Sequence, residues 1–146
     1  MKARKGFTLV ELLIVMAIIA ALMAVLIPMA GGAMKKAKAT RVGVVMRNVE
    51  QGAEQYIMAY LPDTGTNIST STLVQNGYVS ENDILNQITL TTTISATSYT
   101  ISVKYDHGSS DQDLIDMIYS TLKETFTDIS TTTNSITITA TGSRFW

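Results

Sequence analysis

The sequence predicts an α+β fold in which a long N-terminal helix, half transmembrane and half amphipathic, packs on a small antiparallel sheet with an additional helix. Three observations predict this fold. An almost wholly apolar stretch runs from Phe7 to Ala30, a helical apolar period continues to Leu61, and alternating β-branched runs follow Pro62. The 146 residues have the length of one domain, but the first part requires lipid as its solvent and the second part requires water.

The apolar stretch, residues 7–30, is slightly longer than the about 20 residues that a helix needs to cross a bilayer. Its only charged residue is Glu11. By the positive-inside rule, the preceding Lys2, Arg4 and Lys5 stay in the cytoplasm, so the rest of the chain lies outside it. A cleaved secretory signal fits less well, because its apolar core is shorter and ends in a small-residue cleavage site. A plain single-span anchor remains an alternative.

The second half of the helix, residues 31–61, is predicted to be amphipathic, because its apolar residues recur at spacings of three and four. Pro28 and the pair Gly31 and Gly32 interrupt the pattern, since proline lacks a backbone donor and each glycine costs about 1 kcal/mol relative to alanine. We expect a bend or a locally meltable stretch there. The predicted apolar face is Val42, Val45, Met46, Val49, Ala53, Tyr56, Ile57 and Tyr60, and the charged residues expected elsewhere are Lys38, Arg41, Arg47, Glu50 and Glu54.

Residues 62–146 are predicted to form a globular α+β head. A helix in its middle is expected to begin at Ser110 or Asp111, either of which can cap it, and to end near Asp128. The other expected elements are a short helix from Thr70 to Gly77, a hairpin of Ile88 to Ile94 with Tyr99 to Val103, and a strand from Ser135 to Ala140.

The composition limits the sites that this chain can carry. It has no cysteine, which excludes a disulfide and a thiol-ligated metal. Loss of residues 1–6 would remove three of the 11 basic residues and change the formal net charge from −1 to −4. Such a charge is a poor basis for binding nucleic acid, so DNA binding is possible but not indicated. The sequence suggests no Ser-His-Asp arrangement, phosphate loop or paired carboxylates, so we expect neither an enzyme nor a cofactor.

Two patterns could be drawn as metal sites. His107 could be a ligand, but a lone histidine in a polar turn is more often simply solvated. Asp106, Asp111 and Asp113 could hold calcium, but their spacing matches no ligand loop, and helix capping accounts for two of them. We therefore expect no metal site.

Three patterns concern the surface of the head. Asn67-Ile68-Ser69 fits the N-glycosylation acceptor, although so short a motif often occurs by chance. Thr91 to Thr93 and Thr131 to Thr133 could carry O-linked sugars, and β propensity explains them equally well. Phe145 and Trp146 either dock on a neighbouring molecule or complete the core.

The most informative segment is Lys5-Gly6-Phe7-Thr8-Leu9-Val10-Glu11-Leu12-Leu13-Ile14-Val15. Over about 30 residues the N-terminus resembles prepilins with a class III leader, in the type IV pilin and pseudopilin family. The resemblance implies a pilin-like fold and a prepilin peptidase that cuts after Gly6 and N-methylates Phe7. Glycine suits this position because a residue without a side chain lets a recessed active site close around extended backbone.

The resemblance also implies roles for residues inside the helix. Glu11 is expected to face the N-terminus of a neighbouring subunit and to set the register in the filament core. An acid in a membrane helix costs on the order of 3 kcal/mol on insertion scales, so it requires a partner. Pro28 coincides with a proline near which the helix unwinds in many assembled pili, and Gly31 and Gly32 make the same melting easier here.

The expected organisation has four parts. Residues 1–6 form the leader, 7–30 the transmembrane and filament-core helix, 31–61 its amphipathic continuation, and 62–146 the head. The expected function is that of a structural subunit of a type IV pilus-like filament. Its implied partners are copies of itself, the prepilin peptidase and methylase, and an inner-membrane assembly platform with its ATPase. The precursor is expected in the cytoplasmic membrane, and the assembled filament outside the cell.

Several functions remain open. A pilus would serve adhesion, motility or DNA uptake, whereas a pseudopilin of a type II secretion system would push proteins out of the periplasm. The missing cysteine pair departs from many pilins, and the missing calcium pattern departs from major pseudopilins. A membrane-anchored monomeric binding module is a third class.

Overall fold

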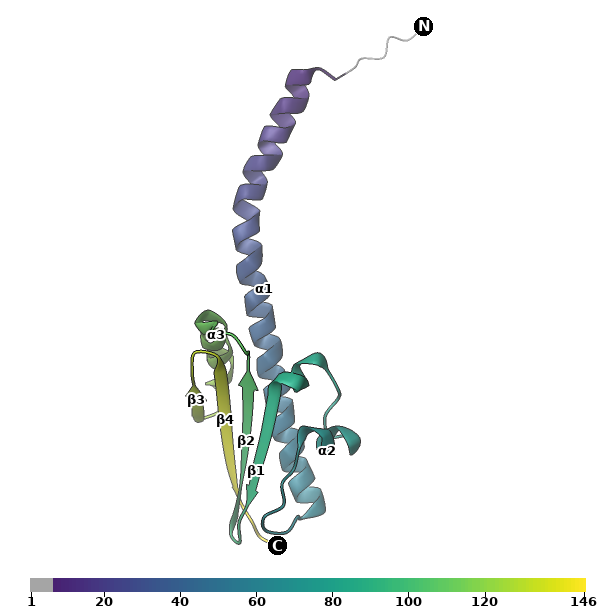
Figure 1. Cartoon of the computed structure of the whole chain (residues 1–146), viewed down its shortest axis with the longest axis vertical. Helices are drawn as coiled ribbons and strands as arrows, with labels where there is room; N and C mark the ends of the chain where they lie inside the picture. The colour runs from purple at the N-terminus through teal and green to yellow at the C-terminus, as the bar shows by residue number, and fades with distance from the viewer. Residues whose placement is uncertain (1–6) are drawn as a thin grey trace. The chain divides into compact units, whose positions relative to one another are not determined.

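The computed structural model describes residues 7–146, which form an α+β fold (Figure 1). Contacts divide the chain into two compact units, residues 1–35 and residues 36–146. We call residues 7–35 the N-terminal helical unit and residues 36–146 the head. The predicted fold class is confirmed, with a long apolar N-terminal helix, a small antiparallel sheet and further helices. The elements are α1 (Leu9–Tyr60), α2 (Thr70–Gln75), the 3-10 helix η1 (Asp83–Gln87), β1 (Ile88–Ile94), β2 (Ser98–Asp106), α3 (Gln112–Leu122), β3 (Asp128–Thr131) and β4 (Ser135–Ser143).

Helix α1 continues through Pro28, Gly31 and Gly32 without interruption. Proline removes one backbone donor, and the helix accommodates that loss. Among the described residues, no heavy atom outside the immediate backbone would lie within 4 Å of a Cβ added at either glycine. The helix assignment is continuous here, and the bend or locally meltable stretch expected at these residues stays a prediction.

The sheet of the head has four antiparallel strands in the order β1-β2-β4-β3 (Figure 1). The predicted hairpin is confirmed: β1 pairs with β2 from Ile88 opposite Tyr105 to Ile94 opposite Tyr99. β2 and β4 are each longer than predicted, because they pair with each other over nine residues from Ser98 to Asp106. The two longest strands thus form the centre of the sheet.

The predicted end of α3 was wrong. The helix was expected to reach about Asp128, but it ends at Leu122, and Asp128 begins the unpredicted strand β3. Phe126 misled the prediction because it follows Leu122 at helical spacing. Its backbone N–H does donate to the Leu122 carbonyl at 3.0 Å, but as part of a turn that leads into β3.

The short helix α2 begins and ends with local signals. Ser69 is its N-cap, and its hydroxyl accepts a hydrogen bond from the Thr72 backbone at 3.2 Å. After the helix, Gly77 adopts a positive φ of 76°, and the Tyr78 backbone N–H donates to the Leu73 carbonyl at 2.9 Å. The predicted helix at this position is confirmed.

The core of the head lies between the part of α1 after residue 36, the sheet and α3. The helical spacing predicted most of the α1 face correctly, although Tyr60 is 56% exposed. The core residues from α1 are Ala39, Val42, Val45, Met46, Val49, Ala53 and Ile57, and those opposite them include Ile101, Val103, Tyr105, Leu114, Ile115, Ile118, Leu122, Ile136 and Ile138.

Gly52 permits the closest approach between α1 and the segment that follows α2. A Cβ at this position would lie 2.8 Å from Val79 Cγ2 and 3.1 Å from the Tyr78 carbonyl oxygen. The second atom belongs to the backbone and cannot rotate away. Gly52 is therefore required by packing, in spite of the poor helix propensity of glycine.

We expect Gly52→Ala to lower the free energy of unfolding by about 1–3 kcal/mol, because the clash outweighs the gain in helix propensity. Denaturant unfolding of the full chain in detergent, followed by the fluorescence of its single tryptophan, measures this change. The matched control is Gln55→Ala on the exposed side of the same helix. Equal stability of the Gly52 variant and the wild type would contradict the packing argument.

Candidate assembly site

The N-terminal helical unit has an apolar surface that no other described residue covers. All its described residues are exposed, and its large apolar side chains keep from 47% of their surface at Val15 to 85% at Phe7. Helix α1 is the one helix within residues 7–146 that is long and apolar enough to cross a membrane, by length and composition. Such a surface must be covered by lipid or by other protein chains.

Glu11 belongs to a capping box at the start of α1. The Thr8 backbone N–H and the Thr8 hydroxyl both donate to Glu11 Oε2, at 2.8 and 2.7 Å. In return, the Glu11 backbone N–H donates to Thr8 Oγ1 at 3.3 Å. These reciprocal bonds satisfy two backbone donors that a helix start leaves open. The sequence analysis missed this role, although a threonine three residues before a glutamate is its usual signal.

The capping box leaves part of the Glu11 carboxylate available. Both bonds from Thr8 end on Oε2, and among the described residues no donor is bonded to Oε1. The carboxylate also lies in the first turn of α1, where the helix dipole favours a negative charge. Glu11 Oε2 is thus held by Thr8, while Oε1 has no donor within residues 7–146.

The other predicted site residues lie at different places along the N-terminal helical unit or outside the described residues. Gly6 lies outside the described residues, and Phe7 is exposed just before α1 begins. Pro28 is 17 residues beyond Glu11, which is about 26 Å along a helix. The segment of Pro28, Gly31 and Gly32 is therefore separate from the N-terminal site.

The fold and the N-terminal segment together define a pilin-like class of protein, with one long apolar helix and a small α+β head. Comparison with protein families supports this class: residues 1–27 match the model described as the prokaryotic N-terminal methylation motif. This motif is the class III leader of type IV pilins and pseudopilins, which are structural subunits. The match supports a type IV pilin-like or pseudopilin-like precursor that is anchored in the membrane. Comparison of the chain with curated proteins and with solved structures gave no match.

The C-terminal residues close the head at the end of the sheet. Arg144 Nη1 donates to Thr64 Oγ1 at 2.5 Å and to the Ser95 carbonyl at 3.1 Å. Trp146 Nε1 donates to the Pro62 carbonyl at 3.2 Å, and the Arg144 guanidinium lies 5.3 Å from the centre of the tryptophan ring. We call Arg144 and Trp146 the C-terminal clasp. It connects the loop after α1, the β1–β2 turn and the end of β4.

Of the two terminal aromatic residues, Trp146 packs against the core, whereas Phe145 remains 76% exposed. We therefore expect Trp146→Ala to lower the free energy of unfolding by about 2 kcal/mol, because the half-buried ring and its hydrogen bond are lost. Phe145→Ala is the matched control and should change stability by less than about 0.5 kcal/mol. Far-UV circular dichroism during thermal unfolding in detergent compares the two. Equal effects would exclude the clasp as a stabilising contact.

The residues considered as metal ligands have other contacts. His107 Nδ1 lies 3.4 Å from Lys38 Nζ and 3.3 Å from the Tyr105 hydroxyl, so His107 is not simply solvated as expected. Asp106 accepts a hydrogen bond from the Gly108 backbone at 2.9 Å, and Asp111 caps α3. Within the described part of the chain, no three histidine, cysteine or acidic side chains form a group that could hold a metal ion.

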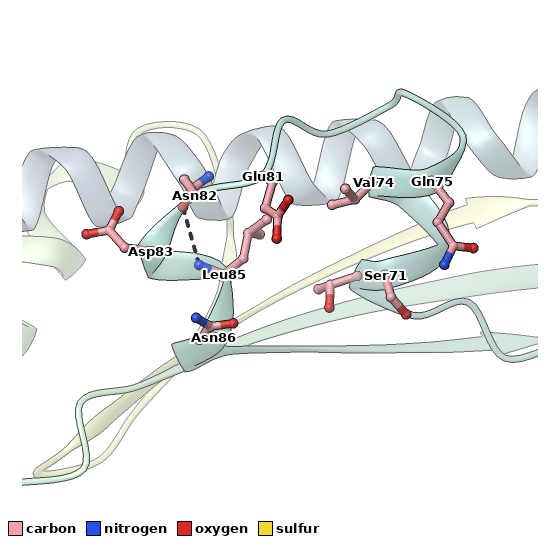
Figure 2. Close-up of a pocket in the computed structure, with 9 residues that line it drawn as sticks. Ser71, Val74, Gln75, Glu81, Asn82, Asp83, Leu85 and Asn86 are labelled. Atoms are coloured by element: carbon pink, nitrogen blue, oxygen red, sulfur yellow. Dashed lines mark hydrogen bonds between the residues drawn. The ribbon is translucent and has the colours of Figure 1, made fainter.

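A surface groove of about 590 Å³ lies between α2 and η1. Figure 2 shows Val74 and Gln75 of α2 on one side of it and residues around η1 on the other. Asn82 caps η1 by accepting hydrogen bonds from the Ile84 and Leu85 backbones, at 3.1 and 3.3 Å. Asp83 is paired with Arg41 of α1 at 2.6 Å. These polar groups hold the wall of the groove in place, and their arrangement assigns no ligand to it.

Glu50 corrects another expectation. The helical period placed it away from the apolar face of α1, yet it is only 7% exposed. Residues 125–128 and the end of β4 lie beside this part of α1 and widen its buried face. Burial and the nearby Glu54 carboxylate raise the pKa of Glu50 above its ordinary value of 4.5. Among the described residues, no donor is bonded to this carboxylate.

We expect Glu50→Gln to stabilise the isolated subunit at neutral pH. The folded state binds the Glu50 proton more tightly than the unfolded state, so the wild type loses stability as the pH rises from 4.5 through the raised pKa. The advantage of the variant should therefore shrink on acidification and vanish below pH 4.5, where the carboxyl is protonated in both states. Denaturant midpoints at several pH values measure it. A gain that does not depend on pH would contradict this explanation, and Glu124→Gln is the exposed control.

Proposed function

We propose that the chain is the structural subunit of a type IV pilus-like filament. The observation that carries the proposal is a methylation motif at residues 1–27 that overlaps the N-terminal helical unit, in which every described residue is exposed. In the membrane, lipid covers this surface, and in a filament the helices of other copies replace the lipid. The same surface thus serves both states.

The proposed sequence of events has four steps. The precursor inserts with residues 1–6 in the cytoplasm, and prepilin peptidase cuts after Gly6 and methylates Phe7. An assembly platform, driven by a cytoplasmic ATPase, then extracts the subunit from the membrane. Finally the N-terminal helices pack into the filament core, and the head covers the outside of the filament.

Glu11 supports this assignment because of its geometry. Cleavage after Gly6 would give Phe7 a new, positively charged amine, and the open Oε1 of Glu11 on a neighbouring copy is a suitable acceptor for it. Inside an apolar bundle, a register that leaves either charge alone is strongly unfavourable. The proposed pair would therefore set the register of the subunits.

A pseudopilin of a type II secretion system is the second candidate, because the leader motif is common to pilins and pseudopilins. Both candidates require the same cleavage and the same helical core. They differ in where the filament ends: a pilus extends from the cell surface, whereas a pseudopilus stays in the periplasm. Location is therefore the discriminating property.

We expect protein sheared from the cell surface to begin at N-methylated Phe7, as measured by intact mass and N-terminal sequencing, and membrane extracts to contain the uncut precursor as well. Glu11→Gln should be cut normally but give roughly tenfold fewer sheared filaments, because its amide can replace the bond to Thr8 but not the charge. Processed protein that stays in the periplasm would favour the pseudopilin. An uncut chain that stays in the membrane would contradict both candidates and leave the plain anchor.

A further inference from the structure

Glu50 lines a hollow on the head that its own chain does not fill. The hollow has a volume of about 420 Å³ and lies between α1, the turn after α3 and the end of β4. Its wall is rich in oxygen, with the carboxylates of Glu50 and Asp128 and several threonine hydroxyls. The residues that line it are Glu50, Gln51, Thr125, Phe126, Thr127, Asp128, Thr139, Ala140 and Thr141.

Within residues 7–146, no cationic side chain is paired with this carboxylate. Arg47, one turn earlier on α1, donates to Thr125 Oγ1 at 2.7 Å. The Tyr99 hydroxyl donates to Glu54 at 3.0 Å. Glu50 is thus more than nine-tenths buried. No donor among the described residues is bonded to its carboxylate, and this carboxylate is not among the fully buried side-chain atoms without a partner, so it faces the hollow. A cation from a second molecule could offset the free energy that its partial desolvation costs.

We propose that a lysine of a second copy of this chain enters the hollow and pairs with Glu50, and that the lysine is Lys36. This inference rests on the proposed filament. A lysine suits the hollow because its long apolar stem can pass the rim while its ammonium group reaches the carboxylate. A metal ion suits it less well, since within residues 7–146 no group of three ligating side chains is present.

The charges of the head support this choice of donor. Among the described residues, Lys36 and Lys123 are exposed lysines without a side-chain partner. Lys123 lies two residues before Thr125, which lines the hollow together with Glu50. Lys123 and Glu50 therefore lie at about the same position along the direction of α1. In the proposed helical filament, successive subunits are displaced along the filament axis, so the lysine that reaches Glu50 has to lie at a different position along α1. Lys36 meets this condition, because it precedes Glu50 by 14 residues of α1, or about 21 Å.

The direction of the displacement also agrees with the register proposed for Glu11. Pairing Phe7 of one copy with Glu11 of another moves the first copy toward the C-terminal end of the second helix. In a copy that is displaced further in the same direction, Lys36 comes closer to the position of Glu50 on the second copy. The Phe7–Glu11 pair would then join subunits in the core of the filament. The Lys36–Glu50 pair would join the heads, further from the filament axis.

The absence of cysteine from the chain allows a direct test by thiol-specific cross-linking. In the double variant Lys36→Cys with Glu50→Cys, the two thiols of one chain are separated by about 21 Å of helix, which is too far for a short bismaleimide to bridge. Between two paired copies, the same reagent replaces the combined length of the lysine and glutamate side chains. We expect filaments treated with it to give a ladder of oligomers on a denaturing gel. Each single variant and the control Lys123→Cys with Glu50→Cys should give no ladder.

A second measurement separates a role in assembly from a role in folding. Glu50→Gln is expected to stabilise the detergent-solubilised subunit and yet to make sheared filaments dissociate at a lower temperature than the wild type. Lys36→Gln should weaken the filaments without stabilising the subunit. Opposite effects on subunit and filament would not arise if Glu50 acted within its own head.

The outcomes distinguish this inference from the proposed function. Wild-type filaments with no ladder in the double variant, or with unchanged stability in Glu50→Gln, would overturn the pairing and leave the filament intact. A ladder from Lys123 instead of Lys36 would overturn the assignment of the donor. If the wild type formed no filament, the proposed function would fail, and the pairing would fail with it.

Discussion

The exposed apolar surface of residues 7–35 is the constraint on which the rest of the structure depends. Water solvates such a surface poorly, so lipid or other protein chains must cover the N-terminal helical unit. The core of the head accordingly uses no residue from this unit, and its first buried residue on α1 is Ala39. Every residue of this core lies after residue 35, so the core of the head can pack while residues 7–35 lie in the membrane.

In the proposed filament, Glu11 has to be accommodated first in lipid and then in the filament core, and the capping box offers an explanation for both. The bonds from Thr8 replace part of the hydration that the carboxylate loses in the membrane. Both bonds use Oε2, and Oε1 has no donor among the described residues. The side chain that sequence analysis treated as an unsatisfied charge is therefore held in place before any partner arrives.

Local patterns in the sequence predicted most of the fold. The apolar period of α1 and the alternation of β1 and β2 depend on neighbours a few residues away, so the predicted elements agree with the structure. The strand β3 was missed because Phe126 continues the spacing of α3 although the backbone leaves the helix. The burial of Glu50 and the hollow beside it could not be predicted, because they arise where α1, the turn after α3 and β4 meet. Such contacts leave no periodic signal.

The C-terminal clasp has a consequence for how the head matures. It joins residues 62–64 to residues 144–146 through hydrogen bonds and a cation–π contact, and so closes about 80 residues of chain into a loop. A disulfide at this position would need an oxidant and an export pathway that supplies one. The clasp forms through noncovalent contacts alone, so it requires no oxidant. A subunit that opens under strain can also close again without enzymatic repair.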